Sequence, residues 1–153
     1  MNFISLTFKN LIIVSFVMRE LVLYGHIILG LAIVVLSVFI LMEMKKKSSY
    51  LKPMAAATAF MSWLAMLPGG ILYLTFYPAT KTVIKAGPWP WAHSIVMETK
   101  EHWALLLPVI ATVAAWLVYK DQLKESKKWW VLLIALTVVL AITGRIIKMG
   151  AVS

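Results

Sequence analysis

The sequence predicts an all-α protein, a transmembrane bundle of four helices with up-down topology, and two observations support this prediction. First, 62% of the 153 residues are hydrophobic and 14% are charged, with a mean hydropathy of +0.90. An average soluble domain is about 45–50% apolar and about 25% charged. Second, the apolar residues gather in four runs of about 20 residues, the length that an α-helix needs to span a bilayer. The chain is therefore expected to be a small multi-pass membrane protein.

Charged residues and prolines set the boundaries of the expected spans. The four helices are predicted over residues 21–42, 53–77, 92–119 and 129–147, within one domain of residues 21–153. The third helix follows the stretch Pro88-Trp89-Pro90, which fits helix initiation because proline is tolerated in a first turn.

The first 20 residues form a separate N-terminal segment. Its apolar run from Leu11 to Met18 is too short to span, and Arg19 and Glu20 interrupt it. A signal peptide is not expected, since the segment has neither a basic n-region nor a cleavage site of small residues. The segment either lies in the outer interface or extends the first helix outward, and Met18 is an alternative start.

Composition excludes several classes of function. The chain has no cysteine, so disulfide scaffolds, thiolate metal sites and cysteine nucleophiles are excluded. The net charge of +9 lies in short loops between apolar runs, where membrane topology explains it better than nucleic-acid binding does. No phosphate loop, serine hydrolase arrangement or nucleotide fingerprint is present.

The lysines of two loops predict the orientation. The loop between the first two spans contains Lys45, Lys46, Lys47 and Lys52. The loop between the last two spans contains Lys120, Lys124, Lys127 and Lys128. By the positive-inside rule both loops are cytoplasmic and both termini lie outside. We expect a multi-pass protein of a prokaryotic plasma membrane.

Two of the three histidines fall inside the predicted spans, at the same height. His26 lies 16 residues from Met42 and His102 lies 17 residues from Tyr119, which places them about 24 and 25 Å above the cytoplasmic boundary. Ionisable residues inside a membrane are rare and usually face the bundle interior with a partner. The first and third helices of an up-down bundle are diagonal neighbours, so the two imidazoles could ligate one haem iron.

Glycines and cations lie in the same layer as the histidines. Gly69 and Gly70 thin the second helix, and Gly30 lies one turn below His26; they either make room for haem or serve close helix packing. Arg145 and Lys148 suit haem propionates, because guanidinium pairs well with carboxylate. The alternative for Arg145 is that its side chain extends into the outer interface.

Glu98 and His102 are four residues apart and share one helix face. With His26 they would supply three ligands, enough for a zinc-type site with an open position. The alternative is that Glu98 and Glu101 are solvated acids of the first helical turns. Tyr73 and Tyr77, with the nearby Tyr24, either line a quinone pocket or anchor the membrane interface.

The spacing of His26, the glycine pair and His102 resembles that of small four-span integral membrane haem b proteins, over about residues 21–147. The resemblance implies a b-type haem held by His26 and His102. Because two histidine ligands leave no open iron position, electron transfer is expected rather than oxygen chemistry. His93 is expected about 39 Å above the cytoplasmic boundary, outside the hydrocarbon. As a third histidine it departs from a scheme with two histidine ligands.

Three functions therefore stand as hypotheses. The first is electron transfer through haem b near the outer face, with a quinol or a partner redox protein. The second is a metal or proton site built from His26, Glu98 and His102 in a transporter or membrane enzyme. The third is a homo-oligomeric or accessory subunit of a larger membrane complex, in which the polar layer stabilises packing.

Overall fold

The protein is a bundle of four long helical segments. The computed structural model describes residues 3–46 and 48–152, with side chains from residue 13 onward. The first segment is α1 (Phe3–Lys46) and the fourth is α7 (Leu123–Gly150). The second and third are interrupted helices, and all four are long and apolar enough to cross a membrane. The chain is thus a multi-pass membrane protein, and the predicted all-α four-helix bundle is confirmed.

The two middle segments are built from short helices joined end to end. The second contains α2 (Leu51–Leu64), α3 (Met66–Ile71), η1 (Leu72–Phe76) and α4 (Tyr77–Ala86). The third contains η2 (Ala92–Met97), α5 (Glu98–Ala104) and α6 (Leu106–Tyr119).

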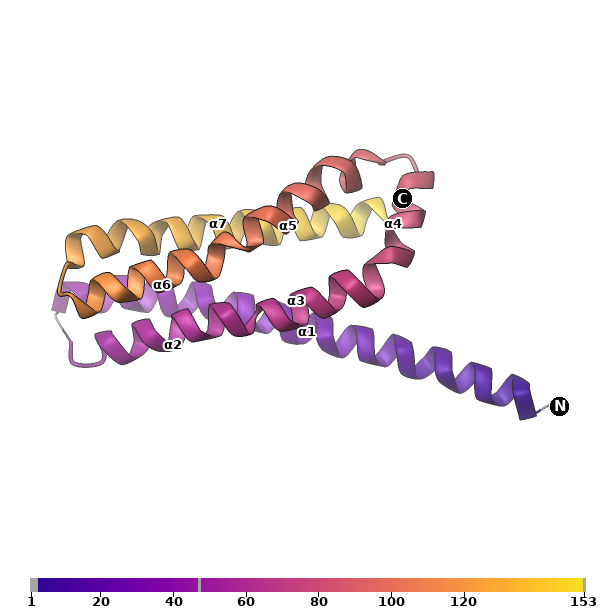
Figure 1. Cartoon of the computed structure of the whole chain (residues 1–153), viewed down its shortest axis with the longest axis horizontal. Helices are drawn as coiled ribbons and strands as arrows, with labels where there is room; N and C mark the ends of the chain where they lie inside the picture. Colours follow the sequence, from indigo (N-terminus) through magenta and orange to yellow (C-terminus); the bar gives the residue numbers. More distant parts are fainter. Residues whose placement is uncertain (1–2, 47, 153) are drawn as a thin grey trace.

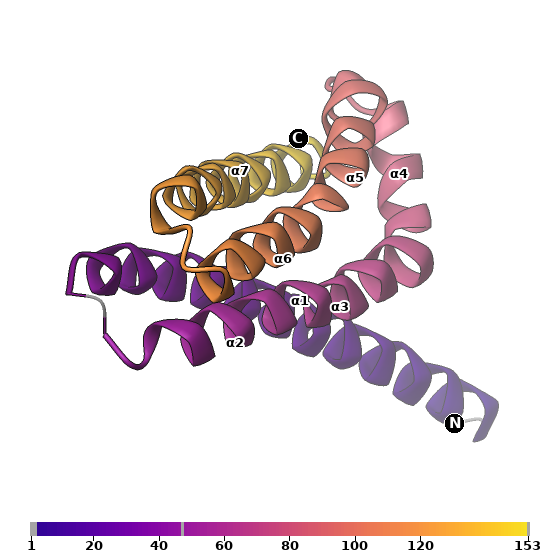
Figure 2. The ribbon, with the colours of Figure 1, turned by 60° about the vertical axis from the view of Figure 1, so that its left-hand side comes forward.

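Neighbouring helices run antiparallel in an up-down arrangement (Figure 1). α1 packs on α2 and α7, and α6 packs on the same two helices. α1 and α6 are therefore diagonal across the bundle, as Figure 2 shows from another side. We call the end with the turns at residues 48–50 and 120–122 the basal end, and the end with the turn at residues 87–91 the distal end.

The basal half of the bundle has an apolar core. It is filled by residues from α1, α2, α6 and α7, among them Ile33, Ile40, Ala55, Ala111, Ala114, Val118, Trp130 and Leu133. The buried polar residues of this half that the structure describes all carry hydroxyl groups. Four of them, Ser37, Thr58, Ser62 and Thr137, donate to the carbonyl four residues earlier in their own helix. Such hydroxyls are satisfied locally and offer no charge to the core.

Two prolines break the middle segments at the same height. Pro68 has no N–H to donate to the carbonyl of Leu64, and the helix is interrupted at Ala65; Pro108 causes the same break at Leu105. Each break lies 14 residues from the basal end of its segment, about 21 Å along the helix. Beyond this level α3 and η1 still pack on α1, and the second segment turns away from α1 at α4, which reaches across to η2 (Figure 1).

The distal half contains two π-helical stretches. In η1 the N–H of Tyr77 donates to the carbonyl of Leu72, five residues back, next to Pro78, which cannot donate. The second stretch, η2, starts directly after Pro88-Trp89-Pro90. π-Helical turns are rare and are frequent at functional sites, so both stretches mark the distal half for closer inspection.

α1 is longer than any expected span. It runs without interruption over 44 residues, about 66 Å, whereas the hydrocarbon core of a bilayer is about 30 Å thick. Arg19 and Glu20 do not end it, and its N-terminal part projects beyond the other helices (Figure 1). Residues 13–18 are exposed in this projecting part.

Candidate functional site

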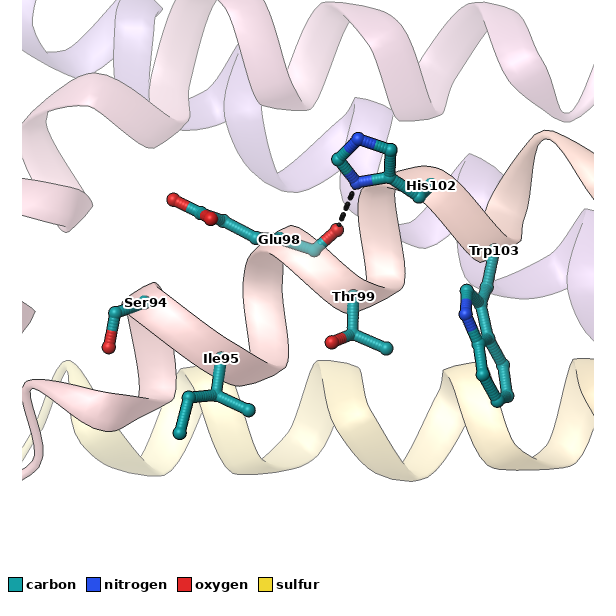
Figure 3. A pocket seen from close by; sticks show the side chains of 6 residues that line it. All are labelled: Ser94, Ile95, Glu98, Thr99, His102 and Trp103. Atoms are coloured by element: carbon teal, nitrogen blue, oxygen red, sulfur yellow. Dashed lines mark hydrogen bonds between the residues drawn. The ribbon is translucent and has the colours of Figure 1, made fainter.

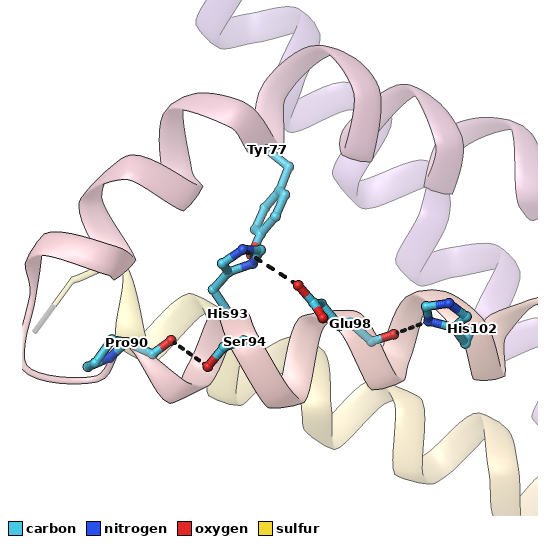
Figure 4. Close-up of polar contacts among 6 residues, drawn as sticks. All are labelled: Tyr77, Pro90, His93, Ser94, Glu98 and His102. Atoms are coloured by element: carbon cyan, nitrogen blue, oxygen red, sulfur yellow. Dashed lines mark hydrogen bonds and ion pairs between the residues drawn. The ribbon is translucent and has the colours of Figure 1, made fainter.

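A buried tyrosine–histidine pair lies at the distal end, where α4 meets η2. The hydroxyl of Tyr77 and Nδ1 of His93 are 2.9 Å apart, and the two residues are 9% and 5% exposed. Ile84, Ala92 and Ile147 pack around them in a small apolar cluster. The turn at residues 87–91 brings the pair together, so two residues 16 positions apart share one hydrogen bond (Figure 4).

The Glu98 carboxylate lies on the other side of the His93 ring. Its Oε1 is 4.0 Å from Nε2 of His93, and the Glu98 side chain is 57% exposed. This distance is too long for a hydrogen bond, but the exposed carboxylate can close it by a change of rotamer. A hydrogen on Nε2 would attract the carboxylate, and in that neutral ring the Tyr77 hydroxyl donates to Nδ1. Tyr77, His93 and Glu98 therefore form a continuous polar row from the interior to the surface.

The backbone carbonyl of Glu98 holds His102 in one tautomer. Its Nδ1 lies 2.7 Å from the backbone carbonyl oxygen of Glu98 (Figure 4). A carbonyl oxygen only accepts, so Nδ1 carries the hydrogen and Nε2 of the neutral ring keeps its lone pair. The His102 side chain is exposed, and Nε2 is free to accept a proton or to bind a metal ion.

His102 and Glu98 line an open hollow on the surface of η2 and α5 (Figure 3). Its volume is about 410 Å³, and its walls are formed by Ser94, Ile95, Glu98, Thr99, His102 and Trp103. Ligand sites combine apolar walls with a few convergent polar groups. Here Ile95 and Trp103 supply the apolar walls, and a carboxylate and an imidazole supply the polar groups.

Tyr73 adds an aromatic layer on the inner side of this row. Its ring stacks on Tyr77, with centroids 5.7 Å apart and planes 17° apart. Both tyrosines come from the π-helical stretch or its first following residue, which is consistent with a functional use of that stretch.

Two further polar side chains, His26 of α1 and Lys100 of α5, each lie against a glycine of a neighbouring helix. The His26 ring packs against Gly69, where an added Cβ would meet Cε1 at 3.2 Å, and its buried Nδ1 has no hydrogen-bond partner among the described residues. The Lys100 side chain packs against Gly144, where an added Cβ would meet Nζ at 3.0 Å.

The other predicted site residues lie elsewhere. Arg145 and Lys148 are exposed on α7, and Gly30 and Gly70 have no neighbour within 4 Å of an added Cβ. The structure does not form the three-ligand site expected from His26, Glu98 and His102. Residues 3–46 and 48–152 contain no group of three or more His, Cys, Asp or Glu side chains that could hold a metal ion.

His93 is the site residue whose role sequence reasoning missed. A count along straight helices placed it beyond the hydrocarbon, but the bend of the second segment brings Tyr77 over it and buries it. Comparisons with protein-family models, curated proteins and solved structures found no match to this chain.

Proposed function

We propose that this membrane protein binds a membrane-soluble ligand with an ionisable ring hydroxyl, of the hydroquinone type, and accepts its proton. The observation that carries the proposal is that an imidazole, His102, and a carboxylate, Glu98, line one hollow together with the apolar side chains of Ile95 and Trp103. The buried His93–Tyr77 pair lies directly behind Glu98. Trp103 and Ile95 supply the apolar surface against which such a ring would pack.

The polar row of Glu98, His93 and Tyr77 offers the proton a route from the hollow toward the interior. A hydroxyl in the hollow would donate to Nε2 of His102 or to Glu98. When Nδ1 of His93 carries the hydrogen and donates it to the Tyr77 oxygen, Nε2 has a lone pair, and rotation of the protonated Glu98 toward Nε2 would pass the proton to the His93 ring. The buried residues described in the basal half include no ionisable side chain. The proposal therefore concerns proton exchange at the distal end and does not include conduction across the membrane.

The proposal also includes the orientation of the protein in the membrane. Both basal loops are rich in lysine, and lysine-rich short loops are retained in the cytoplasm. The distal end, the hollow and both termini would then lie at the outer face of a prokaryotic plasma membrane.

Binding of decylubiquinol by the detergent-purified protein, measured anaerobically through quenching of tryptophan fluorescence, tests this proposal. We expect His102→Ala and Glu98→Gln to weaken binding about tenfold, the loss of one good hydrogen bond. Glu125→Gln, at an exposed basal carboxylate paired with Lys128, is the matched control. The ligand control is the dimethyl ether of the same hydroquinone, which has no ring hydroxyl. Equal affinity for the hydroquinone and its ether would contradict the proposal.

A second candidate function is electron transfer through a b-type haem held by His26 and His102. It is favoured by the two imidazoles themselves, since Nε2 of His102 is free and Nδ1 of His26 is buried without a described partner. The His26 ring lies against Gly69, where a larger side chain would displace it. The haem would supply one-electron redox chemistry, and two imidazole ligands would leave its iron no open position. A quinol or a redox protein would be the electron partner.

Optical spectra of the purified protein, oxidised and then reduced with dithionite, test the haem candidate together with a pyridine haemochrome assay. We expect near-stoichiometric haem that is lost in both His26→Ala and His102→Ala and retained in His93→Ala. A colourless protein from haem-replete cells would exclude this candidate and leave the hydroquinone proposal intact.

A further inference from the structure

The basal end carries a surplus of positive charge. Residues 43–52 and 120–128, which include both basal turns, contain eight lysines and three acidic residues, a formal surplus of five charges. An ion pair of 3.1 Å between Lys52 and Asp121 links the two stretches, and both turns lie at the same end of the bundle (Figure 1). The lysines of the two stretches therefore share one end of the molecule.

The acidic residues of this end are already paired. The three pairs, with distances of 3.0, 3.1 and 2.8 Å, are Glu43–Lys46, Asp121–Lys52 and Glu125–Lys128. Four other lysines of this end take part in no ion pair within residues 3–46 and 48–152, and these are Lys45, Lys120, Lys124 and Lys127. Because their charges are not balanced by carboxylates of the described chain, this end attracts anions from outside it.

Two of these lysines lie on a face of α7 that continues into exposed apolar residues. Lys124 and Lys127 are three residues apart, and Val131 follows four residues later, so the three side chains are neighbours on the helix surface. Both lysines are exposed, and Val131 and Val138 are 50% and 44% exposed. This face therefore presents two ammonium groups at the basal end and an apolar surface beyond them.

We infer that this face of the basal end binds an anionic phospholipid, with its phosphate at Lys124 and Lys127 and an acyl chain along Val131 and Val138. Ammonium groups form strong, charge-assisted hydrogen bonds with phosphate oxygens. Clusters of lysine directly beside a membrane-spanning helix are attracted to anionic lipid. A soluble anion would contact the lysines but leave the apolar part of the face unused. The site lies at the opposite end from the hydroquinone hollow and does not depend on the proposed function.

Titration of the detergent-purified protein with two phospholipids tests this inference. Dioleoyl phosphatidylglycerol and dioleoyl phosphatidylcholine have the same acyl chains, and only the first carries a net negative charge. The rise in melting temperature with lipid concentration gives the dissociation constant of each lipid. Glycerol phosphate, which has the phosphate and no acyl chain, is the third ligand.

We expect phosphatidylglycerol to bind about tenfold more tightly than phosphatidylcholine. Lys124→Gln/Lys127→Gln should remove most of this preference, and Lys124→Arg/Lys127→Arg should keep it. The matched control is Lys81→Gln/Lys85→Gln, which removes the same charge from α4 at the distal end and should keep the preference. Raising the ionic strength from about 0.1 M to about 1 M should weaken the preference, because the screening length falls from about 10 Å to about 3 Å.

Three results would overturn the inference. The first is equal affinity of the unchanged protein for the two lipids. The second is an equal loss of preference in the basal and the distal double variants. The third is binding of glycerol phosphate as tight as that of phosphatidylglycerol, which would identify a soluble anion instead of a lipid.

Discussion

Removal of the Tyr77 hydroxyl tests the central contact of the distal end. Tyr77→Phe keeps the ring that stacks on Tyr73 and deletes only the atom 2.9 Å from Nδ1 of His93. His93 is 5% exposed, so water cannot readily replace the lost partner. A buried polar atom left without its partner costs about 1–3 kcal/mol, and we expect the free energy of unfolding to fall by this amount.

Unfolding by SDS in mixed micelles, followed by far-UV circular dichroism, measures the change. Tyr24→Phe is the matched control, because Tyr24 is 60% exposed and no hydrogen bond to it is described; we expect a change within about 0.5 kcal/mol. His93→Phe and the double variant complete a cycle in which removal of both partners costs less than the sum of the single changes. If Tyr77→Phe matches Tyr24→Phe, or the cycle shows no coupling, the hydrogen bond does not stabilise the distal end.

Four further variants, two for packing and two for backbone geometry, are tested by the same unfolding assay. Gly150→Ala would place a Cβ 2.9 Å from the Cβ of Ala92, and since neither group can rotate away we expect a loss of about 1–3 kcal/mol. Gly30→Ala meets no atom within 4 Å and should stabilise the helix by about 0.5–1 kcal/mol; a loss at both sites would refute the packing argument. Asp121 has φ 57° at the basal turn, so Asp121→Val should cost about 1–2 kcal/mol. Asp121→Gly, which also removes the exposed ion pair to Lys52, should change stability by less than about 1 kcal/mol. Equal losses of stability in the two Asp121 variants would contradict the argument from the positive φ.

The bundle was predictable because it follows from quantities that need no three-dimensional information. Apolar runs of membrane-spanning length and short connections are enough to give four antiparallel helices. The course of the second segment was not predictable in the same way, because the direction of an interrupted helix depends on what it packs against. The consequence is large, because the turn after η1 carries Tyr77 and α4 across to η2.

The candidate site was harder to predict, since a count along straight helices gives height but not the direction in which a side chain points. His26 and His102 were predicted to lie at the same height, and the structure places the first against Gly69 and the second at an open hollow. Lys100 lies between Glu98 and Glu101 in the sequence, yet its side chain packs against Gly144 of α7. About half a helical turn, two residues, separates an inward residue from an outward one. Sequence spacing alone cannot fix the rotation of α5.

The two proposed functions compete for one atom, Nε2 of His102. Acceptance of a proton from a hydroquinone needs the lone pair of this nitrogen to be free, whereas haem ligation would occupy it permanently. His26 separates the two, because it is an iron ligand in the haem candidate and has no part in the hollow. A variant His26→Ala that still binds the hydroquinone through His102 therefore argues for the proton-accepting site. Loss of a Soret band in that same variant argues for haem, and in that case the His93–Tyr77 pair remains as a positioning element of the distal end.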